Sequence, residues 1–419
     1  MLSVDEALDL VLKHARPLPV RAVPLDDALS LTLAEDVASD IDSPPYDKSI
    51  VDGYAIRAED MASGVAELRV LEEVVAGAVP SHLVESGTAT RIMTGAPIPV
   101  GANAVVMIEQ SELFDRDGVT SVRLTSAAPK TGQSIMPRGS SMHRGDVVLN
   151  VNHTLNSVAI GLLAELGRTQ VVVRPLPSVA VLATGNELVP PDQTPGPGQI
   201  RNSNESMLAA LVRSHARDVR RLGIARDDRD DLRRSITEGL EADVLLLSGG
   251  VSAGVLDLVP SVLEELGVRQ VFHKVQLKPG KPLWFGVYEP DDHRTLVFGL
   301  PGNPVSTLVC YHLFVRWALE RLRGRGEAST GLTPKQLRIK ARLTEEFVHQ
   351  GERPTYYPAR IGYIKEEKRL VVTPLRYRGS GDLRALVDAT CLIAFPPGDK
   401  TYRVGKKVKA IGLHWIGPA

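Results

Sequence analysis

The segment LLLSGGVSAGVLD, residues 245–257, places three glycines after a run of apolar residues. The run predicts a buried strand, and the Ser248-Gly249-Gly250 turn after it would let backbone N–H groups approach a ligand closely. A helix starting behind such a turn adds a partial positive charge, which suits an anion such as phosphate. The alternative is a tight strand-to-helix turn with Ser252 as the helix cap. The loop matches neither GxGxxG nor GxxxxGK[ST], so a dinucleotide or P-loop site is not supported.

Two proline-containing turns add candidate ligand contacts. Lys278 and Lys281 flank a Pro-Gly turn that disfavours helix and regular strand, so two ammonium groups are held near one another. Such a pair suits a bound anion, and the alternative is a solvated surface pair. In the second turn, Pro301, Asn303 and Pro304 either fix a backbone shape for flat contact with a ligand or only start the next helix.

Carboxylates follow several of the predicted strands. They are supplied by Glu187, Asp227, Asp228 and Asp257. Beside phosphate-binding lysines, such acids indicate a hard cation such as Mg²⁺, held by one or two carboxylates and by substrate phosphates. The alternative for Asp228 and Asp257 is helix N-capping, and Asn204 has the same two interpretations.

The elements that would position these residues alternate regularly. Strands are expected at 178–184, 218–224, 243–247, 268–276 and 295–300, and helices at 204–216, 228–240, 258–267 and 304–323. This order predicts a doubly wound, mostly parallel α/β sheet. Because ligands of such sheets bind outside the carboxyl ends of the strands, the candidate loops should share one edge.

The rest of the chain predicts further domains. Ser3 and Glu6 form a capping box for an N-terminal packing helix, and short strands separated by Gly and Pro predict a β unit between residues 44 and 138. Residues 145–167 begin extended and end as a helix that Gly167 stops. We therefore expect a multidomain α/β plus β fold. The predicted domains are a discontinuous helical first domain (1–46 and 141–176), an inserted β domain (47–140), a central α/β domain (177–326) and a C-terminal β domain (327–419).

Composition excludes several classes of protein. With 43% hydrophobic and 24% charged residues, the 419-residue chain has the composition of a soluble globular protein. Its formal net charge is −1, so no bulk basic field would attract nucleic acid or an anionic membrane. No apolar run has the length of a membrane span, and the acidic N-terminal helix is unlike a signal peptide. Two cysteines and ten scattered histidines predict neither a disulfide framework nor a thiolate or histidine metal site. We expect a cytoplasmic protein.

Seven motifs in order resemble one known family. They are VDGYAIR (51–57), IMTGAPIPVGANAVVMIE (92–109), VLATGNELV (181–189), GQIRNSN (198–204), SGGVSAGVLD (248–257), KPGKPLWFG (278–286) and GLPGNPVSTLV (299–309). Together they resemble the molybdopterin molybdenumtransferases, the MoeA/gephyrin E-domain family, over essentially the whole chain. The resemblance implies a homodimer of four-domain subunits with a molybdopterin-binding α/β domain third. It implies that molybdate is inserted into the dithiolene of adenylated molybdopterin with Mg²⁺-dependent release of AMP, and that other cofactor-biosynthesis proteins and recipient molybdoenzymes are partners.

The same resemblance assigns residues to the site. It places Asp52 and Thr94 on the second domain, in a cleft completed by the other subunit. It assigns catalytic roles to Asp52, Thr94, Glu187, Asp227 and Asp257, with Asp227 and Asp257 as metal ligands. Its third-domain side also includes Lys278, Lys281, Pro301 and Pro304. Together with the loop analysis, the expected substrate contacts are Asn204, Ser248, Gly249, Gly250, Ser252, Lys278, Lys281, Pro301, Asn303 and Pro304.

The chain departs from the family pattern at three positions. Ser141 and Asn103 stand where the family usually has acids, and Lys48 stands where Asn is frequent. Two alternatives follow, a non-catalytic molybdopterin-binding or scaffold paralogue and a tungstate-preferring paralogue. A third alternative is a transferase that adenylylates molybdopterin. The acids of the site favour turnover over a scaffold, and the two β domains favour metal insertion over adenylylation.

Overall fold

The computed structural model describes residues 1–251, 258–291, 293–325 and 338–413. The chain forms two compact units. The first unit comprises Met1–Ala34, Asn152–Leu155 and Val171–Ala419, and the second comprises Glu35–Val151 and Asn156–Gln170. No helix of the described part is long and apolar enough to cross a membrane.

A six-stranded sheet is the centre of the first unit. Its spatial order is β17 (Asp218–Ala225), β14 (Ser178–Thr184), β18 (Val244–Ser248), β21 (Thr295–Leu300), β20 (Trp284–Tyr288) and β19 (Arg269–His273). The first four strands run parallel, and β20 is antiparallel to both of its neighbours. This confirms the predicted mostly parallel sheet.

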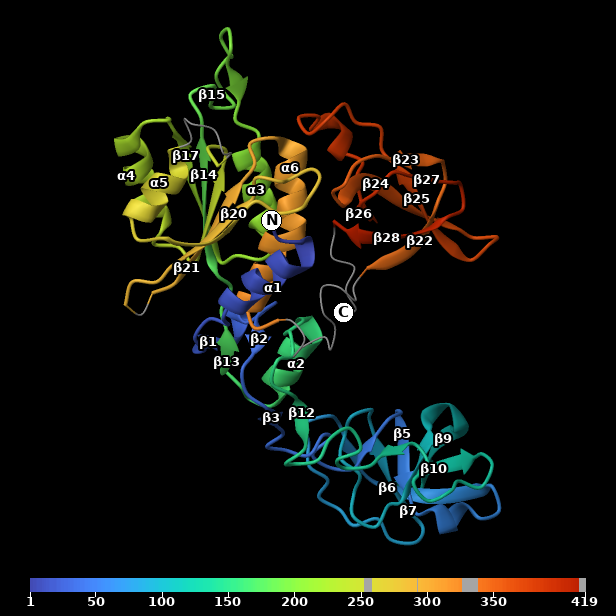
Figure 1. The fold of residues 1–419 in the computed structure, drawn as a ribbon. Coiled ribbons are helices and arrows are strands. Elements are labelled where there is room, and N and C mark those ends of the chain that lie inside the picture. Colours follow the sequence, from blue (N-terminus) through green and yellow to red (C-terminus); the bar gives the residue numbers. More distant parts are fainter. Residues whose placement is uncertain (252–257, 292, 326–337, 414–419) are drawn as a thin grey trace. The chain divides into compact units, whose positions relative to one another are not determined.

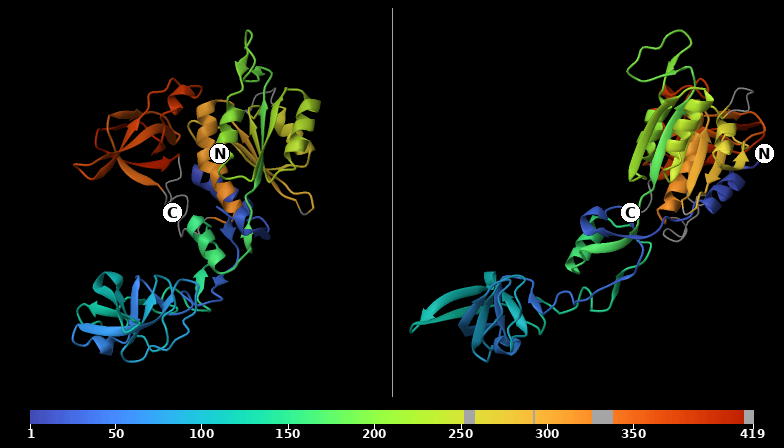
Figure 2. Two further views of the ribbon diagram at one scale, coloured as in Figure 1. Left: turned by 180° about the vertical axis from the view of Figure 1, so that it is seen from behind. Right: turned by 90° about the vertical axis from the view of Figure 1, so that its left-hand side faces the viewer.

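Helices cover both faces of this sheet (Figure 1). Strand β14 is buried along its whole length, and alternate side chains enter different cores, because successive residues of a strand point to opposite faces. Val179 and Val181 join the core of α1, α3, α6 and α7, whereas Ala180 and Leu182 join that of α4 and α5. Figure 2 shows these helical layers from behind and from the side. The helices are α1 (Val4–His14), α3 (Asn204–Val212), α4 (Arg229–Gly239), α5 (Val259–Glu265), α6 (Pro304–Cys310) and α7 (Arg316–Leu322), with a π-helical turn, η4 (Tyr311–Val315), between the last two.

The predicted capping box of the N-terminal helix is present. The Ser3 hydroxyl accepts a hydrogen bond from the Glu6 N–H at 3.2 Å, and the Glu6 carboxylate accepts one from the Ser3 N–H at 2.8 Å. The buried face of α1 packs into the same core as the α/β sheet. The predicted packing helix therefore belongs to the first compact unit.

A closed barrel forms the C-terminal part of the first unit. Its strand order is β22 (Ile339–Leu343), β25 (Arg369–Pro374), β24 (Thr355–Ile364), β26 (Cys391–Phe395) and β28 (Lys407–Gly412). Strands β23 (Phe347–His349) and β27 (Lys400–Tyr402) pair separately. A small sheet of β1 (Arg21–Pro24), β13 (Gln170–Arg174) and β2 (Thr32–Leu33) completes this unit.

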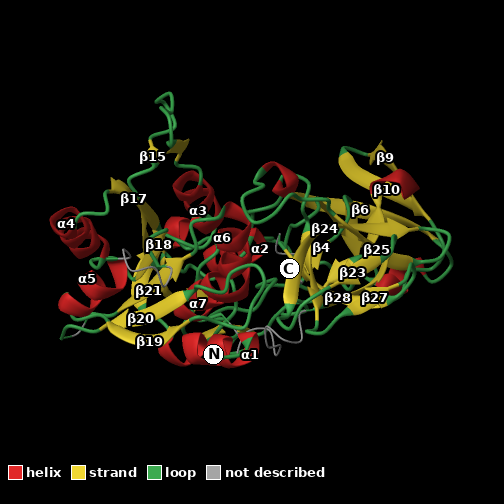
Figure 3. Ribbon diagram, turned by 45° about the horizontal axis from the view of Figure 1, so that its top comes forward, coloured by secondary structure: helices red, strands yellow, loops and turns green. Residues whose placement is uncertain are grey.

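The second unit is mainly strands and turns (Figure 3). Its six-stranded sheet has the order β8 (Ala104–Met107), β5 (Gly53–Ile56), β7 (Thr88–Ile92), β6 (Val65–Val74), β10 (Val119–Thr125) and β9 (Ser111–Arg116). Short pairs join β11 (Ile135–Met136) to β4 (Lys48–Ser49) and β12 (Val147–Leu149) to β3 (Val37–Ala38), and one helix, α2, spans Ser157–Glu165. The expected multidomain α/β plus β fold is thus confirmed, whereas the four domain boundaries stay a prediction.

Sequence periodicity did not predict strand β20. Residues 284–288, WFGVY, form a short apolar run interrupted by Gly286, which gives no alternation to separate strand from loop. A side chain at Gly286 would approach the Trp284 ring to 2.3 Å, so the glycine makes room for that ring. The strand adds an antiparallel member to the sheet and connects the loop of Lys278 to the core.

Candidate functional site

The carboxyl ends of the parallel strands meet at one edge, as predicted. Ser248 pairs in register with Ala183 of β14 and Leu300 of β21, and Thr184 pairs with Ala225 of β17. The loops that follow β14, β17, β18 and β21 therefore start side by side. The loop after β19 starts at the same edge, because β19 and β21 are both antiparallel to β20.

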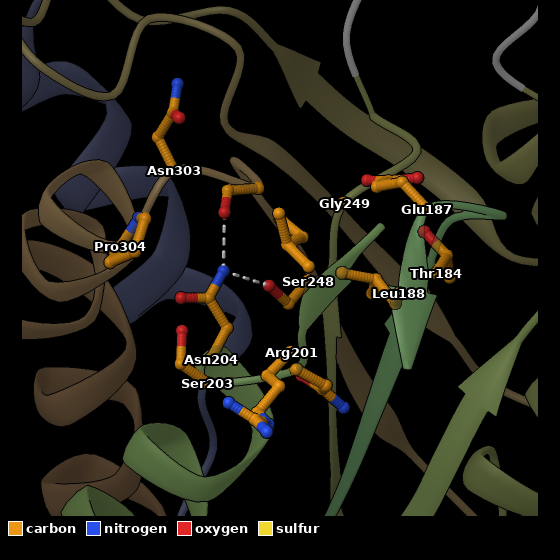
Figure 4. A pocket seen from close by; sticks show the side chains of 13 residues that line it. Thr184, Glu187, Leu188, Arg201, Ser203, Asn204, Ser248, Gly249, Asn303 and Pro304 are labelled. Carbon is orange, nitrogen blue, oxygen red and sulfur yellow. Dashed lines mark hydrogen bonds between the residues drawn. The ribbon is translucent and has the colours of Figure 1, made fainter. Parts of the chain in front are cut away.

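A pocket of about 270 Å³ lies at this edge (Figure 4). The loop after β14, the strand and turn before α3, the end of β18 and the turn before α6 line it. The lining residues are Thr184, Glu187, Leu188, Ile200, Arg201, Asn202, Ser203, Asn204, Ser248, Gly249, Gly302, Asn303 and Pro304. Arg201 is the one cationic and Glu187 the one acidic side chain among these described residues. The structure thus brings six predicted site residues together, namely Glu187, Asn204, Ser248, Gly249, Asn303 and Pro304.

Asn204 is the central polar group of the pocket. Its Nδ2 donates to the Ser248 Oγ at 2.9 Å and to the Gly302 carbonyl at 2.6 Å. Since a carbonyl can only accept, these bonds fix which amide atom is nitrogen. The side chain caps no helix, because Ser203 is the N-cap of α3. Asn204 is 8% exposed, and its Oδ1 has no hydrogen-bond partner in the described structure. A buried acceptor without a partner costs free energy, so Oδ1 is suited to an N–H or O–H donor of a ligand.

Thr184 supplies a second polar atom of this kind. Thr184 is 2% exposed, and its Oγ1 also has no hydrogen-bond partner among the described residues. Two glycines of the predicted anion loop lie against it. A Cβ on Gly249, whose φ is +99°, would lie 2.5 Å from the Thr184 carbonyl oxygen, and one on Gly250, whose φ is +64°, would lie 2.6 Å from Oγ1. The loop therefore needs both glycines for its conformation and for close packing.

The acids of the edge have different environments. Glu187 lines the pocket and is exposed. Asp227 and Asn186 exchange hydrogen bonds, with Asp227 N–H donating to Asn186 Oδ1 at 3.1 Å and Asn186 N–H donating to Asp227 Oδ2 at 3.3 Å. Asp228 caps α4 by accepting from the N–H groups of Asp230 and Asp231, so the capping interpretation holds for it. Within the described ranges, no three metal-binding side chains gather.

The lysine turn faces a different pocket. Lys278 pairs through its backbone with the barrel, donating to the Pro354 carbonyl at 3.0 Å and accepting from the Tyr356 N–H at 2.9 Å. Its side chain lines a separate cavity of about 310 Å³ with barrel residues, including Tyr357 and Tyr377. Lys281 is exposed and lines neither cavity. The expected grouping of both lysines with the glycine loop is thus not present in this arrangement, because backbone pairing holds the turn to the barrel.

Other predicted contacts lie behind the pocket or outside the described residues. Pro301 is buried, and its carbonyl accepts from the Thr307 hydroxyl at 2.6 Å. Gly250 supports the pocket without lining it. Ser252 and Asp257 lie outside the described residues.

Asp52 and Thr94 form a pair in the second unit. The Asp52 carboxylate accepts from the Thr94 N–H at 2.7 Å and from its hydroxyl at 2.8 Å. These two hydrogen bonds hold the pKa of Asp52 below its usual range, and the bond from the Thr94 N–H has the larger effect. Both residues are exposed, so the pair presents an ionised carboxylate and a hydroxyl to solvent.

The departure at Asn103 has a structural explanation. Its Oδ1 accepts from the Ala58 N–H at 2.7 Å, and its Nδ2 donates to Glu59 at 3.1 Å. An aspartate could accept the first bond but could not donate the second. Ser141 lies on the surface of the second unit, and its N–H donates to the Ser43 carbonyl at 2.9 Å.

Seven lining residues of the pocket were not predicted as site residues, namely Thr184, Leu188, Ile200, Arg201, Asn202, Ser203 and Gly302. Arg201, Asn202 and Ser203 stand in the GQIRNSN motif, which precedes α3 and lines the pocket. Asn202 is held by Glu205, whose carboxylate accepts from Asn202 Nδ2 at 3.0 Å and from the Gly223 N–H at 3.1 Å. The GQIRNSN motif itself could have indicated Arg201, Asn202 and Ser203, because a polar run directly before a helix at the edge of a sheet places several hydrogen-bond donors together.

Three family models match successive parts of the chain. The models of the MoeA N-terminal region (domain I and II), the probable molybdopterin binding domain and the MoeA C-terminal region (domain IV) match residues 2–167, 180–321 and 340–413. The α/β domain that carries the pocket thus matches a probable molybdopterin-binding domain, and the chain is of the multidomain MoeA type.

Relatives cover nearly the whole chain. The molybdopterin molybdenumtransferases of Staphylococcus aureus (strain COL) and Bacillus subtilis (strain 168) are 34% and 33% identical over 420 residues, covering 98% of this chain and 95% and 94% of theirs. The crystal structure of the molybdopterin biosynthesis MoeA protein from Pyrococcus horikoshii has a TM-score of 0.80 at 30% identity, covering 99% of this chain and 100% of that one. The chain belongs to the MoeA family of molybdopterin molybdenumtransferases, and it is a transferase of molybdenum cofactor biosynthesis.

Proposed function

We propose that this enzyme inserts molybdate into the dithiolene of adenylated molybdopterin and releases AMP with the help of Mg²⁺. One observation carries the proposal for this site: Asn204 Oδ1 and Thr184 Oγ1 are buried in a carboxyl-edge pocket without hydrogen-bond partners among the described residues. Both the pterin and the adenine ring have N–H donors that such acceptors can bind. A ligand that donates these hydrogen bonds removes the free-energy cost of leaving the two buried oxygens unpaired, and it therefore binds more tightly.

The pocket residues have distinct roles in this proposal. The backbone at Gly249 lets a phosphate approach, and Arg201 adds a positive charge at the pocket wall. Asn204 binds a ring donor while Ser248 and the Gly302 carbonyl fix its amide. Asn303 and Pro304 offer flat contact at the turn before α6. Preorganised polar groups of this kind orient a substrate without rearrangement during the reaction.

The carboxylate oxygens at this edge are ligand atoms of the type that a magnesium ion prefers. Mg²⁺ prefers oxygen ligands and is held by one or two acids together with substrate phosphates. Glu187 and Asp227 would hold it, and the predicted ligand Asp257 lies outside the described residues. When bound, the ion would neutralise negative charge on the phosphates as AMP leaves. Asn186, which exchanges hydrogen bonds with Asp227, would orient that carboxylate.

We further propose that the active enzyme is a homodimer and that Asp52 and Thr94 act with the α/β pocket of the other subunit. This rests on the resemblance described above. The ionised Asp52 carboxylate, oriented by two bonds from Thr94, could place a water molecule or the oxyanion during exchange. The cytoplasmic location and the binding of other biosynthetic proteins or recipient molybdoenzymes also stay predictions.

The decisive assay supplies the full-length protein with adenylated molybdopterin, Mg²⁺ and either molybdate or tungstate, and it measures AMP release. Release with molybdate supports the proposal. Faster release with tungstate would favour the tungstate-preferring alternative. Tight binding of adenylated molybdopterin without release under either condition would favour a scaffold protein.

Mixing two inactive variants tests the shared site. Assayed at a concentration of adenylated molybdopterin well below the Kd of Asn204→Ala, the variants Asp52→Asn and Asn204→Ala should each lose most of their activity as homodimers. After subunit exchange, a mixed dimer has one site in which both residues are intact, so part of the activity should return. If each variant is inactive alone and no activity returns in verified mixed dimers, the two residues act within one subunit. If no mixed dimers form at all, the dimer proposal is wrong.

A further inference from the structure

The C-terminal barrel has a groove that the proposed function does not use. Its volume is about 610 Å³, and residues of β22, β24, β26, β27 and β28 and of the adjoining turns line it. Its walls carry six cationic side chains: Arg338, Lys340, Lys400, Lys406, Lys407 and Lys409. No acidic residue is among the described residues that line it. This concentration of positive charge contrasts with the net charge of −1 of the whole chain.

Strand pairing makes the charges of this groove unfavourable by themselves. Lys340 of β22 pairs directly with Lys409 of β28, and Arg342 pairs with Lys407 two residues along. Like charges directly opposite one another on neighbouring strands destabilise a sheet. All three of these lysines are exposed. The register of the barrel therefore holds two cation pairs beside one another on its outer surface.

Acidic side chains of the same unit do little to offset this charge. Arg338 pairs with Asp5 at 3.2 Å, and Arg342 donates to the Gly405 carbonyl at 2.7 Å. The Lys400 ammonium lies 5.4 Å from the centre of the Tyr402 ring. Across the described ranges, no ion pair joins any of the five lysines of the groove to a carboxylate.

We infer that this groove binds a small anion with a chain of phosphates, such as inorganic tripolyphosphate or the phosphate chain of a nucleotide. The lysines approach the groove from β22, β27, β28 and the turn before β28, so one compact polyanion can contact several of them together. The volume lies within the range of about 300–1,000 Å³ that is typical of small-molecule sites. The five barrel strands close on themselves, so β22 and β28 offer an acidic peptide no free strand edge to pair with.

The test uses the full-length protein and isothermal titration with tripolyphosphate at fixed ionic strength. The variant Lys340→Gln/Lys409→Gln removes one cross-strand pair. Its matched control, Lys130→Gln/Lys365→Gln, removes two exposed lysines elsewhere. We expect tripolyphosphate to bind the wild type and the control equally, and to bind the groove variant about tenfold more weakly or worse, because two charge-assisted contacts are lost. Binding to the wild type should weaken as salt is raised.

Thermal unfolding separates lost binding from lost folding. Without ligand, the groove variant should melt at the same or a higher temperature than the wild type, because a like-charge pair has been removed. Tripolyphosphate should raise the melting temperature of the wild type but not that of the groove variant.

Three further ligands distinguish the possible occupants. Tighter binding of ATP than of tripolyphosphate at the groove would identify a nucleotide as the source of the phosphates, and equal binding would identify the phosphate chain alone. An unchanged affinity of the groove variant would overturn the inference. Binding of a glutamate-rich peptide or an RNA oligonucleotide without binding of tripolyphosphate would overturn it as well.

Discussion

Asn204, the first residue of α3, holds the end of β18 and the turn before α6 together through its amide. Its local sequence allows either a helix cap or a ligand contact, because both functions favour asparagine before a helix. The choice depends on which residue occupies the N-cap position, and in the structure this is Ser203. The partners of Asn204, Ser248 and Gly302, come from distant strands. Only the assembled sheet edge brings them together, so this part of the site could not be predicted from local pattern.

Replacement of Asn204 tests the pocket directly. Asn204→Ala removes the unpaired acceptor and the amide that links two loops, so we expect affinity for adenylated molybdopterin to fall about 5- to 150-fold, equivalent to about 1–3 kcal/mol. Isothermal titration or fluorescence quenching would measure this affinity. Asn150→Ala, at an exposed position of the second unit, is the control. If both variants bind as the wild type does, Asn204 is not a ligand contact.

Glu72 gives a prediction about pH. Burial raises the pKa of its carboxyl, but hydrogen bonds from Ser81 and His82 outweigh burial and lower it from 4.5 to about 2. Because the folded pKa lies below the unfolded value, the stabilisation is complete above pH 4.5 and is lost as the pH falls toward 2.

The variant Glu72→Gln should therefore reduce the free energy of unfolding near pH 7 and have a much smaller effect near pH 2. Urea unfolding across this pH range is the measurement, and the exposed Glu366→Gln is the control. A stability difference from the wild type that does not change with pH would show that the carboxylate contacts contribute no proton linkage.

At the scale of elements, the sequence predicts what its own periodicity encodes. The strands at 178–184 and 295–300 have the predicted bounds, since their apolar runs end at Gly or Pro turns. The sequence predicts the sheet edge at which the turn of Lys278 starts, but not the barrel residues that surround its side chain. Its position follows from backbone pairing with the barrel strand β24, and such long-range pairing has no local signature.

The glycine turn after β18 gives a prediction at this scale. Gly249→Ala would add a Cβ 2.5 Å from the Thr184 carbonyl oxygen in addition to the cost of a positive φ. Gly198 also has a positive φ, +77°, but has open space around its Cβ position. We expect Gly249→Ala to lower the free energy of unfolding by about 1–3 kcal/mol more than Gly198→Ala, and to weaken substrate binding. Chemical denaturation and titration measure both effects. Equal losses in the two variants would mean that the turn can shift to accommodate the methyl group.

The whole molecule consists of two compact units with separate cores. Leu124 is buried in the core of the second unit, and Leu246 in that of the first. The sequence predicts the inserted β region from its turn spacing. It could not predict that α1 packs with the α/β sheet, because an amphipathic pattern shows which face of a helix is buried but not what covers that face.

Separate cores predict separate unfolding. Calorimetry of the full chain should require two transitions, since units with independent cores need not unfold together. Leu124→Ala should lower one transition and Leu246→Ala the other, each by about 2–5 kcal/mol of unfolding free energy. A single transition that both substitutions lower equally would show that the units unfold as one.

The order of the chain has a consequence for synthesis on the ribosome. The buried residues of α1 belong to a core with Val179, Phe285 and Phe314, which are translated much later. A principal core of the second unit is formed by residues between Tyr54 and Leu124 together with neighbouring strands. This unit can therefore fold before the residues that cover α1 have been translated. The nascent chain therefore exposes the apolar face of this amphipathic segment, Val4, Ala7, Leu8 and Val11, after the second unit has folded. We expect a chaperone or the ribosome surface to shelter α1 until the α/β sheet is complete.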